Sequence, residues 1–430
     1  MLLISCAMMP RLQPSLVVCF LFLSYAVAAA GELSVAVDFE GASAREIEID
    51  QEKRVIRFRP GGDPERGWPC WWYLRIDGAT PGETLTLQLR GSTETVSKEA
   101  AAGTHTGLTK PLASSWAMPE RATVSGDGRS WRQTEKGLRQ DDAISYTVTA
   151  DATSMHVAWG PPFTPGDATK LIRTWSEQSP HAKAGELCRS RGGRAVPLLH
   201  IREGDLPDDK RFGVWVQARQ HAWESGSSWV ARGFAEWALS DAAEATWLRR
   251  HAEIFVVPIM DVDNAATGNG GKDALPHDHN RDWSDRPVWT ETMAAQRKVR
   301  ELIDAKRLAV FLDLHNPAPG DPTFFYILDE EFMPDKDAIA GRDRLIALSY
   351  ARISKLKPLI PMSNKPKVTG PKYHPLWKNI SANWVALHGN PQTVSVCLET
   401  IWNGPTSTTD GYRAVGGALA AATQELLSER

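Results

Sequence analysis

The sequence predicts an α/β protein with a mixed, mostly parallel central sheet flanked by helices, preceded by an antiparallel β-sandwich domain. Three observations lead to this fold class. Short β-like runs separated by turn sequences fill residues 32–162, continuous apolar runs alternate with helical stretches beyond them, and the segment GPPFTPGD at 160–167 separates the two patterns. A chain of 430 residues is long enough for two or three domains. We therefore expect a sandwich domain over residues 31–163 and an α/β domain over residues 164–430.

Residues 1–30 have the pattern of a secretory signal peptide. Arg11 precedes an apolar run that starts at Leu16, and the run ends in Ala28, Ala29 and Ala30, a small-residue cleavage pattern. The run is shorter than the roughly 20 residues that a membrane span needs. We therefore expect a cleaved signal, a secreted or periplasmic protein, and no stable membrane insertion after cleavage. A membrane anchor is the alternative.

The charge of the chain limits its expected binding partners, and its cysteine content limits the possible disulfide bridges. The formal net charge is -3, and no basic stripe with interleaved aromatic residues is present, so nucleic acid is not an expected partner. Small molecules and peptides remain, and the sequence does not specify an oligomeric state. Three cysteines follow the signal segment, and an odd number does not indicate a disulfide framework. A bridge between Cys70 and Cys188 is one arrangement that an oxidising compartment would allow.

The first domain is predicted from alternating apolar runs between turns rich in Gly, Pro and Asp. The turns include GGDPERG, GATPGE and SGDGRS. The predicted strands lie at residues 33–39, 53–60, 71–76, 84–89, 143–150 and 154–160. Tryptophans are frequent in and near this domain, and we interpret them as core or inter-domain packing and not as a ligand platform. They are Trp68, Trp71, Trp72, Trp116, Trp131, Trp159 and Trp175.

The second domain is predicted from apolar runs that do not alternate, as in strands buried on both faces. These strands lie near residues 212–216, 254–260, 308–314 and 393–398. Helical stretches lie at residues 227–240, 287–306, 337–356 and 412–428. Strands that alternate with helices indicate a mostly parallel sheet.

Polar side chains follow four of these predicted strands. His221 and Glu224 follow the first, the loop HDHNRDW follows the second, His315 ends the third and Glu399 ends the fourth. Ligands bind beyond the carboxyl ends of the strands in open α/β sheets, so these residues are expected to converge. The sequence therefore predicts a functional site at this edge.

The residue types favour a catalytic zinc site. Such a site takes three protein ligands from His, Asp and Glu and keeps a position for water; two ligands three residues apart project from one face of a turn. His221, Glu224 and His315 fit this set as metal ligands, and Glu399 is the candidate base. Arg281 offers the planar fork that clamps a carboxylate. One alternative is that a member of the cluster His277, Asp278 and His279 binds metal, but we interpret it as a loop that presents Asn280 and Arg281.

In their order and spacing these residues resemble the zinc metallocarboxypeptidases, specifically the cytosolic carboxypeptidase-like branch. The resemblance extends to the first domain, through the segments GWPCWWYLRI, GRSWRQTEKG and HVAWGPPFTPGDATKLI. It therefore covers nearly the whole chain after the signal segment, and it is more specific in the order of the motifs than in any single one.

The resemblance implies one Zn²⁺ per chain, held by His221, Glu224 and His315, with Glu399 as general base and acid. It also implies that Asn280 and Arg281 anchor the free C-terminal carboxylate of a peptide substrate, and that Tyr373 closes over it. One departure is clear. The branch has an arginine ten residues before Arg281 that polarises the scissile carbonyl, but this sequence has Gly271 there and Lys272 next to it. Either Lys272 substitutes for that arginine, or stabilisation of the transition state is left more to zinc.

Strand alternation also places Ser395, Cys397 and Glu399 on one face of their predicted strand. We hypothesise that Cys397 lines the pocket for the terminal side chain of the substrate; a buried filler thiol is the alternative.

The sequence as a whole predicts a zinc-dependent metallocarboxypeptidase that removes C-terminal residues from peptides. Two alternatives remain open. One is an amidase-type member that cleaves cell-wall peptide bonds, and the other is a non-catalytic secreted binding protein on the same fold.

Overall fold

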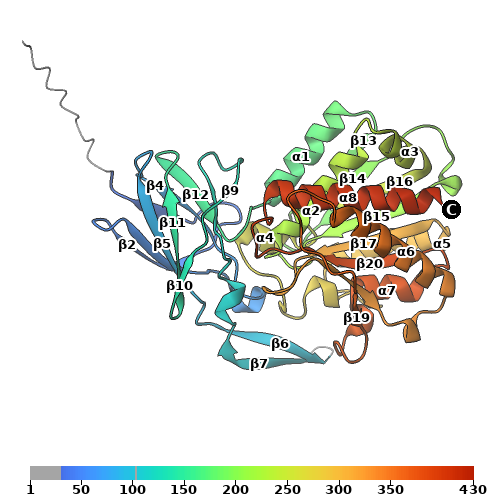
Figure 1. Ribbon diagram of the computed structural model, residues 1–430. Helices are drawn as coiled ribbons and strands as arrows, with labels where there is room; N and C mark the ends of the chain where they lie inside the picture. Colours follow the sequence, from blue (N-terminus) through green and yellow to red (C-terminus); the bar gives the residue numbers. More distant parts are fainter. Residues whose placement is uncertain (1–30, 102–103) are drawn as a thin grey trace, which may run out of the picture.

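A computed structural model describes residues 31–101 and 104–430, and Figure 1 shows a smaller all-β part beside a larger α/β part. The predicted signal peptide at residues 1–30 lies outside the described residues. Among the described helices, none combines the length and the apolar character that crossing a membrane requires.

The N-terminal domain contains two five-stranded sheets and a separate hairpin of β6 and β7. The sheet β1-β4-β12-β8-β9 is antiparallel throughout, whereas the sheet β10-β11-β5-β3-β2 includes one parallel pair, β3 with β5. The strands are β1 (Ser34–Ala36), β2 (Arg45–Asp50), β3 (Val55–Arg59), β4 (Tyr73–Asp77), β5 (Thr84–Arg90), β6 (Thr95–Ala101), β7 (Thr104–Pro111), β8 (Thr123–Ser125), β9 (Arg132–Gln133), β10 (Leu138–Gln140), β11 (Ala143–Thr149) and β12 (Ser154–Ala158).

Strand alternation gives the two sheets a shared core. In β5 the leucines at 85, 87 and 89 are buried, and the residues between them are half-buried or exposed. Trp72 lies in this core with its ring against Phe58 and Tyr146, at centroid distances of 5.3 and 6.1 Å. The predicted β-sandwich is therefore confirmed.

The second domain is built on an eight-stranded mixed sheet with the order β13-β14-β16-β15-β17-β20-β18-β19. Its centre, β16-β15-β17-β20, is parallel, and antiparallel pairs flank it. The strands are β13 (Ala182–Arg189), β14 (Ala195–Ile201), β15 (Phe212–Ala218), β16 (Ala252–Val257), β17 (Leu308–His315), β18 (Phe324–Leu328), β19 (Lys367–Thr369) and β20 (Val394–Glu399). Each strand expected from a continuous apolar run is present, and β17 is buried along its whole length.

Helices flank this sheet in Figure 1, and the four predicted helical stretches correspond to α2, α5, α6 and α8. The helices are α1 (Pro165–Gln178), α2 (Ser225–Ala238), α3 (Ala243–His251), α4 (Val262–Thr267), α5 (Thr290–Asp304), α6 (Lys336–Ile353), α7 (Ser381–His388) and α8 (Thr409–Ser428). Helices α2 and α8 pack closely enough that a Cβ at Gly233 would lie 2.1 Å from the Arg413 carbonyl oxygen. The predicted α/β fold is confirmed.

The register of the parallel strands brings the predicted polar residues together. Ala218 at the end of β15 pairs with Leu314 of β17, and His315 pairs with Glu399 at the end of β20. The turn that begins at Arg219 therefore leaves the sheet beside His315.

A loop of the N-terminal domain packs against the second domain close to this edge. Backbone hydrogen bonds join Trp68 to the Lys272 carbonyl at 3.1 Å and Gly271 to the Arg66 carbonyl at 2.9 Å. The last strand of the sandwich ends at Ala158 and α1 begins at Pro165, and we propose the domain boundary between residues 163 and 164, within this connection.

The disulfide considered above is absent. Cys70 is buried and Cys188 is half-buried, and both are free thiols. Burial raises the pKa of the Cys188 thiol to about 12, so this group stays protonated near neutral pH.

Candidate active site

Three side chains from two segments converge at the carboxyl edge of the sheet. Glu224 Oε1 lies 2.8 Å from His221 Nδ1, and its Oε2 lies 2.7 Å from His315 Nδ1. The two imidazole centroids are 4.8 Å apart, and all three side chains are buried. Ligand atoms of this set lie within 4.8 Å of one another, so the predicted metal ligands form one cluster.

Local structure holds this arrangement. Glu224 is the residue before α2, and the side chain of Asn316, next to His315, accepts a hydrogen bond from the Ser227 amide in the first turn of that helix. Asn316, which follows the ligand candidate His315, thus caps helix α2, which follows the ligand candidate Glu224.

The turn that carries His221 begins with Arg219 in the left-handed region, at φ 61°. The buried Arg219 guanidinium donates to the Ala222 carbonyl at 2.7 Å and to the Phe163 carbonyl in the domain connection. Sequence reasoning did not identify this arginine, because its partners are backbone atoms that no motif encodes.

A carboxylate faces the second nitrogen of each histidine. Asp278 Oδ1 lies 3.4 Å from His221 Nε2, and Asp313 Oδ2 lies 3.0 Å from His315 Nε2. Asp313 also accepts hydrogen bonds from Gln220 and Ser381. Carboxylates in this position fix the ring orientation and raise the basicity of a metal-ligating histidine. Both Nδ1 atoms are then directed at the shared centre.

The donor set fits a zinc ion. Two imidazoles and one carboxylate are the ligands that catalytic zinc sites use, and the site lies in a cavity that would admit a further ligand. Burial alone would raise the pKa of Glu224, but the imidazoles of His221 and His315 lower it to about 2, so the carboxylate is ionised. Glu399 Oε2 is buried without a hydrogen-bond partner among the described residues, as expected beside a centre that holds a further group.

Glu399 lies at the end of β20, opposite His315, and lines the same cavity. Burial, reinforced by the carboxylates of Glu224 and Asp313, raises the pKa of Glu399 to about 8. In the field of a divalent cation this pKa would fall, which favours the ionised form that a base requires. The position and electrostatics of Glu399 suit proton transfer.

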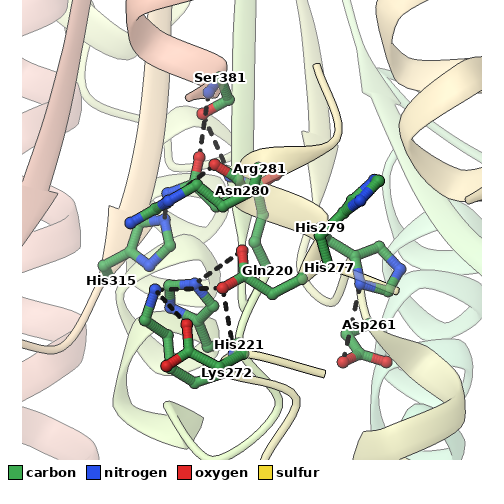
Figure 2. Close-up of polar contacts among 12 residues, drawn as sticks. Gln220, His221, Asp261, Lys272, His277, His279, Asn280, Arg281, His315 and Ser381 are labelled. Carbon is green, nitrogen blue, oxygen red and sulfur yellow. Dashed lines mark hydrogen bonds and ion pairs between the residues drawn. The ribbon is translucent and has the colours of Figure 1, made fainter. Parts of the chain in front are cut away.

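Asn280 and Arg281 lie in the short 3-10 helix His279–Arg281 and also line the cavity. The Asn280 side chain is fixed because its Oδ1 accepts from the Ser381 amide at 3.0 Å, and its amide nitrogen lies 3.2 Å from His315 Nε2. Figure 2 shows Ser381, Asn280 and His315 in contact, with Arg281 adjacent. The loop interpretation holds for the other histidines: His277 Nε2 lies 2.7 Å from Asp282, and His279 lies between Asp261 and Glu291 at 3.7 and 3.8 Å.

The replacement of the expected arginine by Gly271 has a steric explanation. Gly271 has φ 76°, and a Cβ there would lie 2.6 Å from the Ala222 amide nitrogen, in the turn between two metal-ligand candidates. A side chain at this position would displace that turn. Lys272 instead lines the cavity, 3.1 Å from Asp278. Burial would lower the pKa of Lys272, but the carboxylates of Asp278 and Asp273 raise it, so the ammonium is charged.

The remaining predicted residues also lie at the cavity, whose volume is about 190 Å³. Tyr373 lines it with an exposed fraction of 43%, and its ring contacts Tyr326 at a centroid distance of 5.2 Å. Cys397 is buried and lines the cavity with its Sγ 4.0 Å from Glu399 Oε1, which meets the positional part of the pocket hypothesis.

The interpretation of the N-terminal tryptophans as packing residues was incomplete. Trp71, Trp72 and Trp159 are buried in the core, as expected, but Trp68 and Trp116 line the cavity of the second domain. No local pattern distinguished these two groups, because the difference depends on how the domains are placed.

Comparison with known proteins gives a consistent result. Residues 169–307 match the family model described as zinc carboxypeptidase. Cytosolic carboxypeptidase 2 of Danio rerio is 25% identical over 309 residues, which cover 67% of this chain and 41% of that protein, so the chain spans less than half of this relative's length.

Solved structures share the fold over both domains. A metallo-carboxypeptidase from Burkholderia cenocepacia superposes with a TM-score of 0.73 at 18% identity, covering 93% of this chain and 99% of the other. A metallo-carboxypeptidase from Pseudomonas aeruginosa, in complex with (2-guanidinoethylmercapto)succinic acid, gives a TM-score of 0.69 at 19% identity and covers 92% and 99% of the two chains. The family match over residues 169–307 and the similarity to a cytosolic carboxypeptidase relate the chain to the zinc carboxypeptidases, and the solved structures show that it shares the fold of bacterial metallo-carboxypeptidases.

Proposed function

We propose that this protein is a zinc-dependent metallocarboxypeptidase that hydrolyses the last peptide bond of substrates with a free C-terminal carboxylate. One observation carries the proposal. His221 and Glu224, two members of the cluster with His315, line a single cavity together with the buried carboxylate Glu399 and Arg281. A metal centre, a base and a carboxylate clamp are the components that this reaction needs.

A zinc ion held by the three ligands would supply Lewis acidity, which polarises a carbonyl and lowers the pKa of a water molecule. Arg281 and Asn280 bind the terminal carboxylate of the substrate and so place its last peptide bond in the cavity. Glu399 takes a proton from the attacking water and passes it to the amine of the departing residue. Tyr373, at the exposed side of the cavity, covers the bound residue.

Lys272 takes the place of the arginine that would stabilise the negative charge developing on the scissile carbonyl oxygen. Its ammonium lies at the cavity, and Asp278 holds it in position at 3.1 Å. The Lys272 ammonium is a compact charge, whereas an arginine offers a planar fork of donors. A single hydrogen bond from the ammonium to the carbonyl oxygen would therefore supply the stabilisation.

The specificity for a free terminus tests the proposal. We expect a peptide with a free C-terminal carboxylate to be cleaved at least about 100-fold faster, as kcat/KM, than the same peptide with an amidated terminus, because the amide forms no ion pair with Arg281. Mass spectrometry should detect release of single residues from the C-terminus. Equal cleavage of both peptides, or cleavage at internal bonds alone, would count against the proposal.

Replacing Lys272 tests its role separately. We expect Lys272→Ala to lower kcat about 100-fold, as removal of one transition-state donor does in comparable sites, and Lys272→Arg to retain most of the rate. Zinc content should be measured alongside, because Lys272 also pairs with Asp278 behind His221. Full turnover by Lys272→Ala would show that the ammonium takes no part in the reaction.

A further inference from the structure

A row of three indole rings, contributed by both domains, forms part of the cavity wall. Trp68 and Trp116 come from the N-terminal domain, and Trp223 lies between the metal-ligand candidates His221 and Glu224. The ring centroids of Trp68 and Trp116 are 4.7 Å apart, and those of Trp116 and Trp223 are 5.7 Å apart. We call Trp68, Trp116 and Trp223 the indole row. It starts at the metal site and continues to the N-terminal domain.

Hydrogen bonds hold the backbone that carries Trp116 and the indole of Trp68. Trp116 belongs to the short 3-10 helix Ser114–Trp116, and its carbonyl accepts a hydrogen bond from Trp159 Nε1 at 2.8 Å. The next carbonyl, that of Ala117, accepts from Trp72 Nε1 at 2.8 Å. The Trp68 indole donates to Asp273 at 3.0 Å. The rings also pack against one another, and side chains ordered in this way can bind a ligand with a smaller loss of side-chain entropy.

The rings also remain partly open to the cavity. Trp223 is buried, whereas Trp68 and Trp116 are half-buried and contribute to the lining. The exposed parts of Trp68 and Trp116 face the cavity, so a ligand bound there can pack against them. Stacking of aromatic rings contributes beyond simple burial of apolar area.

The position of the row indicates which part of a substrate it contacts. In the proposed function, Arg281 holds the terminal carboxylate and the scissile carbonyl lies at the metal centre. The residue before that bond must therefore continue past the metal ligands, and Trp223 lies in the turn that carries two of them. From there the row continues through Trp116 to Trp68 of the N-terminal domain.

We infer that the N-terminal domain completes the substrate-binding site, and that Trp68 and Trp116 bind the side chain of the residue preceding the scissile bond and favour an aromatic or apolar one. This inference rests on the proposed carboxypeptidase function, because it uses the direction in which the peptide lies. It assigns the domain a part in substrate selection.

The test uses the full chain and N-terminally blocked tetrapeptides that all end in Ala and carry Phe, Leu, Gly or Glu as the penultimate residue. We expect wild type to prefer Phe and Leu over Gly and Glu in kcat/KM. In Trp68→Ala and Trp116→Ala the preference for Phe over Gly should fall by about fivefold, the size of an aromatic pair contribution. A second peptide set that varies the last residue alone should keep its order of preference.

Two further variants separate contact with substrate from a structural effect. Trp68→Phe keeps an aromatic ring but loses the hydrogen bond to Asp273, and it should retain most of the preference. Trp131→Ala removes a half-buried indole of the same domain that contacts Tyr73 and His156 outside this cavity, and it should leave the preference unchanged. An equal rate loss for Phe and Gly peptides, or no change in Trp68→Ala and Trp116→Ala, would overturn the inference.

Binding provides a readout that does not depend on turnover. Calorimetry with Glu399→Gln should give tighter binding of the Phe peptide than of the Gly peptide, and combining it with Trp68→Ala should remove most of that difference. If wild type cleaves none of the peptides, the proposed function fails. Equal binding of the Phe and Gly peptides in the calorimetry would overturn the inference about Trp68 and Trp116.

Discussion

Replacing Glu399 with Gln is expected to lower kcat by about 10²–10⁴-fold, the range that a positioned general base contributes. The substitution keeps the size of the side chain and removes its ability to take a proton. Glu399 lines the cavity and pairs in register with His315, so the change affects the centre of the site. Single-turnover kinetics on a peptide with a free C-terminus would measure the effect.

The control for Glu399→Gln is retention of metal and substrate. Glu399 is not among the three ligand candidates, so the variant should keep its zinc and bind peptide with a similar dissociation constant. Activity close to that of wild type would show that another group is the base.

Replacing His315 with Ala is expected to remove both zinc and turnover. The change deletes one of three candidate protein ligands, leaves the buried carboxylate of Asp313 without its imidazole partner, and leaves Glu224 with the imidazole of His221 alone. We expect peptide hydrolysis to fall below detection, and the free energy of unfolding to decrease by several kcal/mol. Metal analysis by mass spectrometry and chemical denaturation would measure the two effects.

A matched control distinguishes loss of the ligand from loss of a histidine in general. His200 on β14 pairs with Glu253 at 2.9 Å and stacks on Phe255, away from the cavity. His200→Ala should therefore keep zinc and turnover. Normal zinc content in His315→Ala would contradict the assignment.

Much of the fold followed from local patterns. Continuous apolar runs identified β15, β16, β17 and β20, because strands buried on both faces have no polar side to break the run. Four strands of the sheet, β13, β14, β18 and β19, were not predicted. In β13 and β19 exposed positions dilute the apolar pattern. The parallel pairing of β3 with β5 also had no local signal.

The convergence of the candidate site residues could be predicted because they follow strands whose direction the fold fixes. His315 and Glu399 end adjacent parallel strands, so their proximity follows from register. The groups that support them are harder to predict. Asp278 and Asp313 act through the far nitrogens of the histidines, and only Asp313, two residues before His315 on the same strand face, had a usable signal in strand alternation.

The absence of an arginine at Gly271 is explained only when the sequence and the structure are considered together. The sequence identifies a position where a cation is expected and missing, and the structure shows that a side chain there would collide with the Ala222 backbone. The same structure places the neighbouring Lys272 at the cavity. We propose that Lys272 supplies the missing charge from the next position along the chain.

The proposed reaction requires His221, Glu224 and His315 to bind one divalent ion together, and the metal content of the purified chain tests this directly. Native mass spectrometry, followed by elemental analysis, should find about one zinc per chain, lost on chelation and restored by added zinc. A folded protein that contains no zinc and fails to take it up would contradict the proposed metal site.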